Sequence, residues 1–385
     1  MATPVNAVLR WLRRVGALTL KELKQLSRDP ILLAVIAYFF TADIYIAGAG
    51  IRMDLRHASL AVLDHDHSAA SRELIHRFRP PYFHLIGELD SAATAQRMLD
   101  RGEVLLVLDI PPRFERDLRR GEPVDVQLQI DASNATLGIL ATTYAGQIVA
   151  RYGEDQARER LGPIKLETLP TLRDAHRVYY NPNQRDSWFL SISEMLAVTT
   201  MLSLMLPAAA AVREKERGTI EQLMVSPLSS TQILLSKVLA MGLVVLGGVA
   251  VSLFLVIEPA FHVPLKGQLG LFFFTTALYV FATCGLGLFI ATLSRNLGQV
   301  VMLVILILMP LLLLLSGAWT PPEAMPAFLR VAMHASPLFY FTTLSYATLL
   351  KGAGLDLLWP QVLQLAVLGM AVFAFGVWRF RRQFG

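Results

Sequence analysis

Between residues 213 and 227 the chain reads Arg213-Glu214-Lys215-Glu216-Arg217-Gly218-Thr219-Ile220-Glu221-Gln222-Leu223-Met224-Val225-Ser226-Pro227. Long apolar stretches lie on both sides of it, at residues 188–212 and 233–257. Each is long enough to cross a bilayer, which needs about 20 residues at a rise of about 1.5 Å each. The chain therefore holds a polar loop, residues 213–232 (the charged loop), between two predicted membrane spans.

The residues of the charged loop predict a short helix. Gly218 weakens the helix that arrives from the membrane. Thr219 and Gln222 have the spacing of a capping box, so a new helix can begin at Ile220, and Ser226-Pro227 ends it. A helix this short is unstable alone and has to pack on its own chain or on a partner. The alternative interpretation is an ordinary basic loop that satisfies the positive-inside rule.

Composition indicates a membrane protein. The chain has 385 residues, of which 54% are hydrophobic and only 17% are charged, whereas soluble proteins carry about 25% charged residues. The net charge of +5 is weak evidence for nucleic-acid binding, because arginines in loops that flank spans serve orientation first. The single cysteine, Cys284, can form no internal disulfide.

Hydrophobic periodicity divides the chain into spans and connecting segments. Over the first 30 residues, leucines recur with helical spacing on one face and basic residues gather on another. This pattern predicts an amphipathic helix lying on the cytoplasmic membrane surface. The first span follows a tail too long for a signal peptide, so we expect an uncleaved anchor. The predicted segments are an amphipathic helix at 1–30, spans at 31–51, 188–212, 233–257, 269–293, 299–316 and 359–378, short helices on the outer leaflet within 319–358, and a tail at 379–385.

The distribution of basic residues predicts the orientation. One side of the predicted topology carries fourteen lysines and arginines in short segments, and the other side carries only Lys266, Arg330 and Lys351 outside the long insertion. The positive-inside rule then places both termini and the charged loop in the cytoplasm. A seventh span at 338–350 is the alternative, but it is too short and would put the C-terminal arginines outside.

Residues 52–187 contain no long apolar run and are long enough to bury a core of their own. They predict a soluble domain of mixed α/β class on the outer side. The predicted strands are residues 59–63, 104–108 and 124–130, and the predicted helices are residues 69–78, 91–101, 114–120 and 135–161.

Five of the eight histidines lie early in this domain, at His57, His65, His67, His76 and His84. Asp64-His65-Asp66-His67 could ligate a metal, but the spacing matches no closed zinc pattern, so no metal site is predicted. The chain shows no catalytic signature and no Gly-Lys pair, so it has no P-loop for ATP. Any energy source has to be a partner.

The charged loop resembles the signature of ABC-2 type exporter permeases, with the R-E-x-E-x-G-T-x-E-x-L core intact between Arg213 and Leu223 and followed by Ser226-Pro227 and Lys237. The layout of one span, a large outer domain and five further spans is similar over the whole length to inner-membrane subunits of multidrug exporters. The resemblance implies an α-helical integral membrane protein with six transmembrane helices, of the ABC-2 or type V exporter kind. It also implies an inserted extracytoplasmic mixed α/β domain between the first two spans.

The resemblance also implies roles for particular residues. The charged loop would form a coupling helix against a separate nucleotide-binding ATPase subunit, which binds ATP and Mg²⁺, so no cofactor is expected in this chain. The implied contacts are Arg213, Glu214, Glu216, Arg217, Gly218, Thr219, Glu221, Leu223 and Met224 in the loop, and Arg10, Arg14, Lys21 and Lys24 in the N-terminal helix. Two permeases would pair so that their second and fifth spans face each other across a substrate path. From their positions in these spans, the residues expected to line it are Ser193, Glu194, Thr199, Thr200, Ser203, Met302, Met309 and Pro310.

The implied assembly contains two permeases, either two copies or a copy and a paralogue, in the bacterial inner membrane, with a periplasmic adaptor (membrane fusion protein) docked on the outer domain. The implied function is ATP-driven export of amphiphilic or hydrophobic, drug-like compounds. Two alternatives stay open: a membrane scaffold or sensor with an outer ligand-binding domain, and a lipid or polysaccharide exporter of the same superfamily. The sequence does not identify the substrate.

Overall fold

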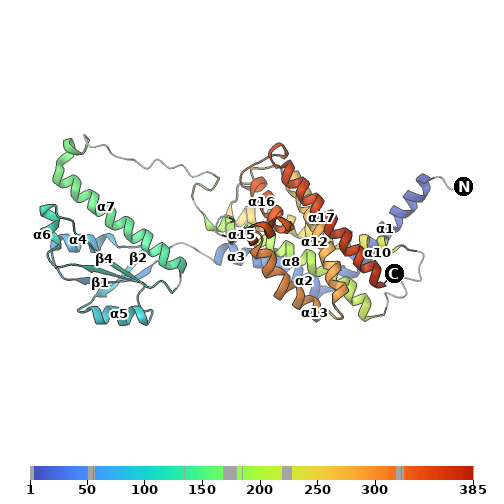
Figure 1. Cartoon of the computed structure of the whole chain (residues 1–385), viewed down its shortest axis with the longest axis horizontal. Helices are drawn as coiled ribbons and strands as arrows, with labels where there is room; N and C mark the ends of the chain where they lie inside the picture. Colours follow the sequence, from blue (N-terminus) through green and yellow to red (C-terminus); the bar gives the residue numbers. More distant parts are fainter. Residues whose placement is uncertain are drawn as a thin grey trace. The chain divides into compact units, whose positions relative to one another are not determined.

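The computed structural model describes residues 4–50, 55, 57–133, 135–167, 180–183, 185–218, 228–317, 322 and 325–384. The chain forms two compact units (Figure 1). Arg52–His176 is the sheet unit, and Met1–Ile51 together with Arg177–Gly385 is the helical unit. The predicted soluble domain ended at residue 187, about ten residues later, because the polar residues that precede the second span were counted with it.

The helical unit contains no β-strand among its described residues. Its elements are α1 (Pro4–Ser27), α2 (Pro30–Tyr38), η1 (Phe39–Asp43), α3 (Ile44–Gly50), α8 (Asp186–Glu216), α10 (Ser230–Val251), η2 (Ser252–Ile257), α11 (Glu258–Phe261), α12 (Leu269–Leu293), α13 (Leu297–Met302), η3 (Leu303–Leu308), α14 (Met309–Leu314), α15 (Ala327–Ala332), η5 (Met333–Ala335), α16 (Pro337–Leu349) and α17 (Leu355–Phe384).

Six helical stretches among the described residues are long and apolar enough to cross a membrane, in agreement with the six predicted spans. They are Pro30–Gly50, Asp186–Glu216, Thr231–Phe261, Leu269–Leu293, Leu297–Leu314 and Leu355–Arg379.

Two helices extend beyond the ranges that the sequence predicted. α8 continues through Glu216, four residues past the predicted end of its span, because its last charged side chains find partners and no glycine or proline lies between residue 212 and Gly218. α17 runs from Leu355 to Phe384, so most of the predicted tail at 379–385 belongs to the last helix. Charged residues marked the end of the apolar run, not the end of either helix.

α12 is packed on several sides by α8, α16 and α17. The rings of Tyr279 on α12 and Phe341 on α16 stack with their centroids 4.1 Å apart. A Cβ at Gly376 on α17 would lie 2.4 Å from the carbonyl oxygen of Gly285 on α12, so these two backbones approach closely. α16 is largely buried in this packing. That the short helices within 319–358 dip into or lie on the outer leaflet stays a prediction.

The fifth span changes its helical type before its proline. A π-helical stretch, η3, occupies Leu303–Leu308, and Pro310 lies in the first turn of α14 directly after it. A π turn accommodates backbone groups that a proline leaves without their usual partner, so the change of helical type is consistent with the position of Pro310. Most of this span stays exposed on the surface of the single chain.

The sheet unit has the strand order β2-β1-β3-β4. β1 pairs in parallel with β2 and β3, and β4 is antiparallel to β3. In chain order its elements are β1 (Ala58–Asp64), α4 (Ala69–Arg77), β2 (Phe83–Glu88), α5 (Ala92–Asp100), β3 (Leu106–Ile110), α6 (Phe114–Arg120), β4 (Gln127–Ile130) and α7 (Ala135–Glu167).

Helices cover both faces of this sheet (Figure 1). On one face Leu74 of α4, Phe114 of α6 and Ala145 of α7 pack with the strands in one buried cluster. On the other face Ala95 of α5 packs on β1 and β3 in a smaller cluster. The α/β character predicted for this segment is therefore present, although β2 was missed and α7 extends to Glu167, past the predicted end at residue 161.

The loop Asp64-His65-Asp66-His67 organises the carboxyl ends of β1 and β3. One carboxylate oxygen of Asp64 accepts hydrogen bonds from the backbone N–H groups of Asp66 and His67, each at 3.0 Å. The other accepts from the Ser71 hydroxyl of α4 at 2.7 Å. Among the described residues no three His, Cys, Asp or Glu side chains gather as a metal site would require. Asp64 is engaged in holding this loop and the first turn of α4.

The hydrogen bonds of Asp66 lead us to expect that the stability of the sheet unit depends on pH. Burial raises its pKa, but hydrogen bonds from the Ser68 hydroxyl and from the backbone N–H groups at the start of α6 lower the pKa by more, so the net value lies below the ordinary 3.8. A lowered folded-state pKa gives stability that is present above pH 3.8 and is lost as the pH falls through the lower folded value.

We therefore expect α6 to lose hydrogen-exchange protection, corrected for intrinsic rates, as the pH falls below that of the ordinary carboxyl group. Asp66→Asn should lower this protection already at neutral pH and make it less dependent on pH. The matched control is Asp90→Asn, in the exposed turn before α5. Equal pH profiles for Asp66→Asn and the unaltered chain would contradict the role given to this carboxylate.

Candidate functional site

The last turn of α8 carries the first four residues of the charged loop, Arg213 to Glu216. The helix ends because Gly218 adopts a positive φ of 65°, a conformation open to glycine and costly for most other residues. The Gly218 N–H donates to the Lys215 carbonyl at 3.2 Å, which closes the turn. Residues 219–227, where the sequence predicts the short helix, lie outside the described residues. Thr219, Glu221, Leu223 and Met224 are among them.

Two side chains of this turn contact the start of the chain and the fourth span. Arg213 forms an ion pair with Asp29, with 3.2 Å between Nη1 and Oδ2. Asp29 is also the N-cap of α2, and the hydrogen bond from the Leu32 N–H, together with Arg213, lowers the pKa of this carboxyl group. Lys215 Nζ donates to the carbonyl of Ser294, the C-cap of α12, at 3.0 Å. The turn is thus tied to α2 and α12.

The other two side chains contact the third and fifth spans. Glu214 binds Lys237 of α10, with 2.8 Å between Oε1 and Nζ. Glu216 accepts a hydrogen bond from the backbone N–H of Leu297, the first residue of α13, at 3.1 Å. A carboxylate is favourable at a helix N-terminus because it satisfies an unpaired N–H and the helix dipole. One turn of α8 therefore contacts four other elements.

Lys237 is the centre of a buried ionic cluster. Its ammonium group also lies 3.1 Å from Glu22 of α1, so two carboxylates from two helices share one lysine. The side chains of Lys237, Glu22 and Glu214 are 3%, 7% and 12% exposed. Lys21 lies 3.7 Å from Glu22 and 3.9 Å from Glu214, which balances the charge of the cluster. We call Glu22, Lys237 and Glu214 the ionic triad.

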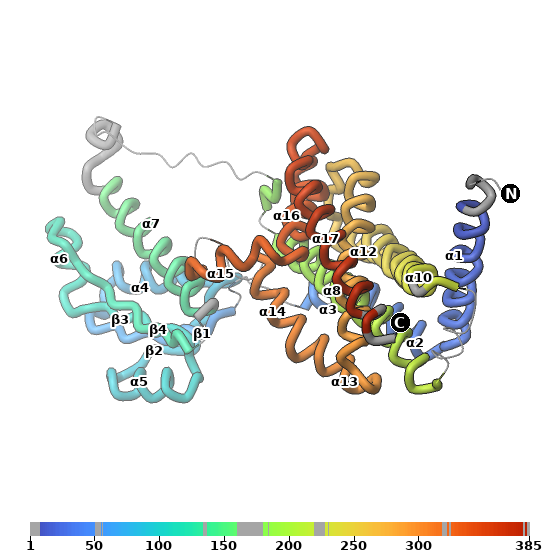
Figure 2. The backbone as a smooth tube through the Cα atoms, turned by 45° about the vertical axis from the view of Figure 1, so that its right-hand side comes forward, coloured from blue at the N-terminus to red at the C-terminus, as the bar shows by residue number. Residues whose placement is uncertain are grey.

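The triad joins α1, α8 and α10 where α1 crosses the start of α10 (Figure 2). Val15 and Leu26 of α1 are buried, and the Thr19 hydroxyl contacts the Ser236 carbonyl of α10 at 3.5 Å. α1 therefore buries one face against its own chain, and its position on the membrane surface stays a prediction. Its basic residues Arg10, Arg14, Lys21 and Lys24, which the resemblance assigned to a partner contact, are on the exposed side.

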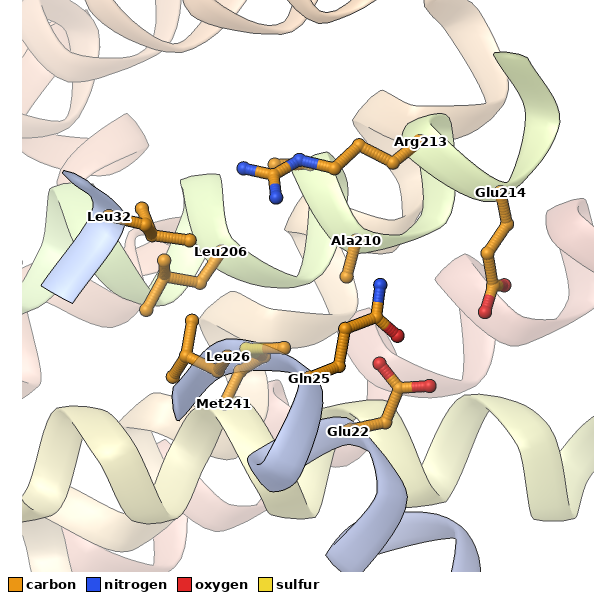
Figure 3. Close-up of a pocket in the computed structure, with 10 residues that line it drawn as sticks. Glu22, Gln25, Leu26, Leu32, Leu206, Ala210, Arg213, Glu214 and Met241 are labelled. Carbon is orange, nitrogen blue, oxygen red and sulfur yellow. The ribbon is translucent and has the colours of Figure 1, made fainter. Parts of the chain in front are cut away.

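A small cavity lies beside the triad, between α1, α2, α8 and α10 (Figure 3). Its volume is about 40 Å³. In Figure 3, Glu22 and Gln25 of α1 point toward α8, and apolar side chains such as Leu26 and Leu206 close the other end. A space of this size holds a few water molecules at most and cannot hold a drug-sized compound. The helices are closely packed at this junction, and the cavity is too small to be a substrate pocket.

The two loop carboxylates differ in exposure. Glu214 is buried and is engaged in the triad, whereas Glu216 is exposed and accepts its hydrogen bond at the start of α13. The contact of both carboxylates with a partner subunit stays a prediction. Arg217 and Gly218, after the helix, are exposed. Lys237 and Glu22 were missed as site residues, although a lone lysine inside an apolar span is itself a signal for a buried partner.

The polar residues predicted to line a path in the second span lie between helices. Thr199, Thr200 and Ser203 are fully buried. Thr200 is hydrogen-bonded to the Tyr279 hydroxyl at 2.8 Å, and Ser203 accepts from Thr283 at 2.7 Å, both on α12. Thr200 and Ser203 thus stabilise the contact of α8 with α12, whereas the Thr199 hydroxyl donates to the Met195 carbonyl of its own helix at 2.6 Å. None of the three faces an open path in this conformation.

The remaining residues of the predicted path lie nearer the surface. Ser193 is hydrogen-bonded to Tyr346 of α16, and Glu194 to Asp43 of η1. On the fifth span Met302 is 60% exposed, Pro310 is exposed and Met309 is half-buried. The predicted path lies between two permeases, so a lining formed by the second and fifth spans stays a prediction for the assembled pair.

Residues 30–378 match the family described as ABC-2 family transporter protein. The chain belongs to this family. Members of the ABC-2 family are the membrane subunits of ABC transporters and lack an ATPase site of their own. The match confirms the family resemblance inferred from the residues of the charged loop.

This ABC-2 family member is similar to several proteins of Escherichia coli (strain K12). It is 35% identical to the inner membrane transport permease YhhJ over 378 residues, covering 98% of this chain and 99% of that protein. It is 30% identical to the probable multidrug ABC transporter permease YbhR, covering 94% and 97%. It is 26% identical to the probable multidrug ABC transporter permease YbhS, covering 90% and 91%. These relatives and the six spans support a multi-pass protein of the inner membrane.

Proposed function

We propose that this ABC-2 permease exports amphiphilic or hydrophobic, drug-like compounds across the inner membrane, driven by a separate ATPase subunit that binds ATP and Mg²⁺. The observation that carries the proposal is the last turn of α8, where Arg213, Glu214, Lys215 and Glu216 each contact a different element. A displacement of the charged loop at this turn has a short route to α2, α10, α12 and α13. The named relatives that are multidrug permeases support the substrate class.

The proposed topology places both termini and the charged loop in the cytoplasm and the sheet unit in the periplasm. The excess of lysine and arginine in the short segments on one side supports it. A second permease, a copy or a paralogue, would complete the path, and the exposed fifth span offers an apolar surface for it. A periplasmic adaptor would bind the sheet unit.

The proposed mechanism is mechanical. ATP binding would draw the ATPase subunits together, and the charged loop and α1 would move with them. The α8 turn would then pass the movement to the spans. Coupling between two sites amounts to about 1–3 kcal/mol in typical proteins, and a buried ionic cluster is strong enough to transmit a bias of that size without breaking.

The test is co-expression of the full chain with a candidate ATP-binding subunit from the same source, followed by purification into lipid. We expect the two to co-purify and ATP hydrolysis to rise when an amphiphilic dye such as ethidium is added. Inside-out vesicles should take up the dye with ATP, and should not when the P-loop lysine of the subunit is replaced by alanine. Dye uptake that is independent of ATP, or an ATPase that ignores this chain, would contradict the proposal.

A further inference from the structure

The edge of the sheet formed by β2 has an open strand beside a basic groove. β2 is the outermost strand, and among the described residues it pairs only with β1. Its other edge therefore presents backbone N–H and C=O groups to the surroundings. Such an edge can pair with another extended chain unless something covers it.

The side chains of this edge are unusually apolar for an exposed strand. Leu85 and Ile86 of β2 are 39% and 49% exposed. Tyr82, just before the strand, is 41% exposed and stacks on Tyr144 of α7. At the opposite edge no described residue of β4 is an exposed large apolar side chain. The two edges of one sheet thus differ, and only the β2 edge has the character of a contact surface.

A groove of about 370 Å³ runs along this edge between β2 and α4. Its floor contains the buried side chains of Ile75 and Phe78. Its rim is lined by Arg72, His76, Arg79 and His84, all exposed, and by a single acidic residue, Glu88. Arg72 and His76 are four residues apart on α4, so they share one face of the helix.

The charge of the groove selects among possible occupants. A second copy pairing through β2 would bring the Arg72 and Arg79 side chains of both copies together, which costs free energy through like-charge repulsion. A segment with carboxylates would complement them. The register irregularity of β2, opposite Leu60 and Ala61, keeps the regular edge short, so it suits a short segment more than a whole sheet.

We propose that the β2 edge binds an extended, acidic segment of a partner protein, which adds as a strand beside β2 and places its carboxylates against Arg72, Arg79 and His84. Main-chain hydrogen bonds would supply affinity, and the groove would select acidic side chains at alternate positions. This inference concerns the sheet unit alone and does not depend on the ATPase partner or on the transported compound.

The experiment uses the full chain in lipid nanodiscs and two labelled peptides, one alternating threonine with glutamate and one alternating threonine with lysine. We expect fluorescence anisotropy to show the acidic peptide binding roughly tenfold more tightly than the basic one. Hydrogen exchange should show added protection at residues 82–89 and not at β4.

Two variants and one control locate the site. Arg79→Glu and His84→Glu should each weaken binding of the acidic peptide several-fold, whereas Arg101→Glu, an exposed arginine at the end of α5, should leave it unchanged. Unchanged protection of β1 and β3 would show that the variants fold. Equal binding of the two peptides, or equal effects of all three variants, would overturn the proposal. Protection of residues 82–89 that rises with protein concentration alone would also overturn it, in favour of a second copy.

Discussion

Replacing Lys237 with methionine is expected to destabilise the helical unit more than any other single charge removal in the chain. The substitution leaves Glu22 and Glu214 buried and facing each other, with only the half-exposed Lys21 beside them at 3.7 and 3.9 Å, so one negative charge is not balanced. Removing one partner of a buried ion pair costs about 3–5 kcal/mol, because an uncompensated charge remains in a poorly solvated place. Thermal unfolding of the purified chain in detergent should show a clear decrease in the midpoint.

A matched control and a compensating variant separate charge from packing. Lys351→Met removes an exposed lysine and should leave the midpoint nearly unchanged. The triple variant Glu22→Gln, Glu214→Gln, Lys237→Met has no buried charge left in the triad and should recover much of the lost stability. If Lys237→Met melts like Lys351→Met, the triad is not the stabilising contact that its geometry indicates.

Gly218→Pro is expected to abolish the response of the ATPase to substrate. Gly218 has a φ of 65°, and proline fixes φ near −65°, so the end of α8 has to change direction. Proline also removes the N–H that donates to the Lys215 carbonyl. The charged loop would then leave the helix along another path, and stimulation of ATP hydrolysis by dye should fall to the unstimulated rate.

The series Gly218→Asn, Gly218→Ala and Gly218→Pro supplies its own control. Asparagine tolerates the left-handed conformation, so its effect should be small. Alanine in this conformation costs about 1–2 kcal/mol, so its effect should be intermediate. A proline variant that responds to dye as fully as the asparagine variant would show that the direction of the chain at Gly218 does not matter for coupling.

The sequence was sufficient to predict the spans and the class of the inserted domain, because both depend on local signals. Apolar runs near the length of a bilayer marked all six spans, and short β-rich runs marked β1, β3 and β4. β2 was missed because its residues, Phe83 to Glu88, follow two prolines and mix histidine and glutamate with apolar side chains. Such an edge strand is defined by its neighbour β1 and not by its own pattern.

The site was harder to predict, because its contacts join residues far apart in the sequence. Glu22 and Lys237 are 215 positions apart, and no local pattern pairs them. The partner contacts of the charged loop were implied by the resemblance and stay a prediction. Four loop residues also make contacts within the chain that only the packing of α2, α10, α12 and α13 creates. Similarly, Thr199, Thr200 and Ser203 looked like a lining, but hydroxyls in a membrane helix also serve contacts between helices.

The most direct test of the proposed coupling is dye-stimulated ATP hydrolysis by the triple variant Glu22→Gln, Glu214→Gln, Lys237→Met, assembled with the ATPase subunit in lipid. This variant should be stable and should assemble, so a loss of coupling cannot be attributed to unfolding. If the ionic triad transmits movement among α1, α8 and α10, unstimulated hydrolysis should persist while stimulation by dye is lost. Full stimulation in a stable, assembled triple variant would show that coupling does not pass through the triad.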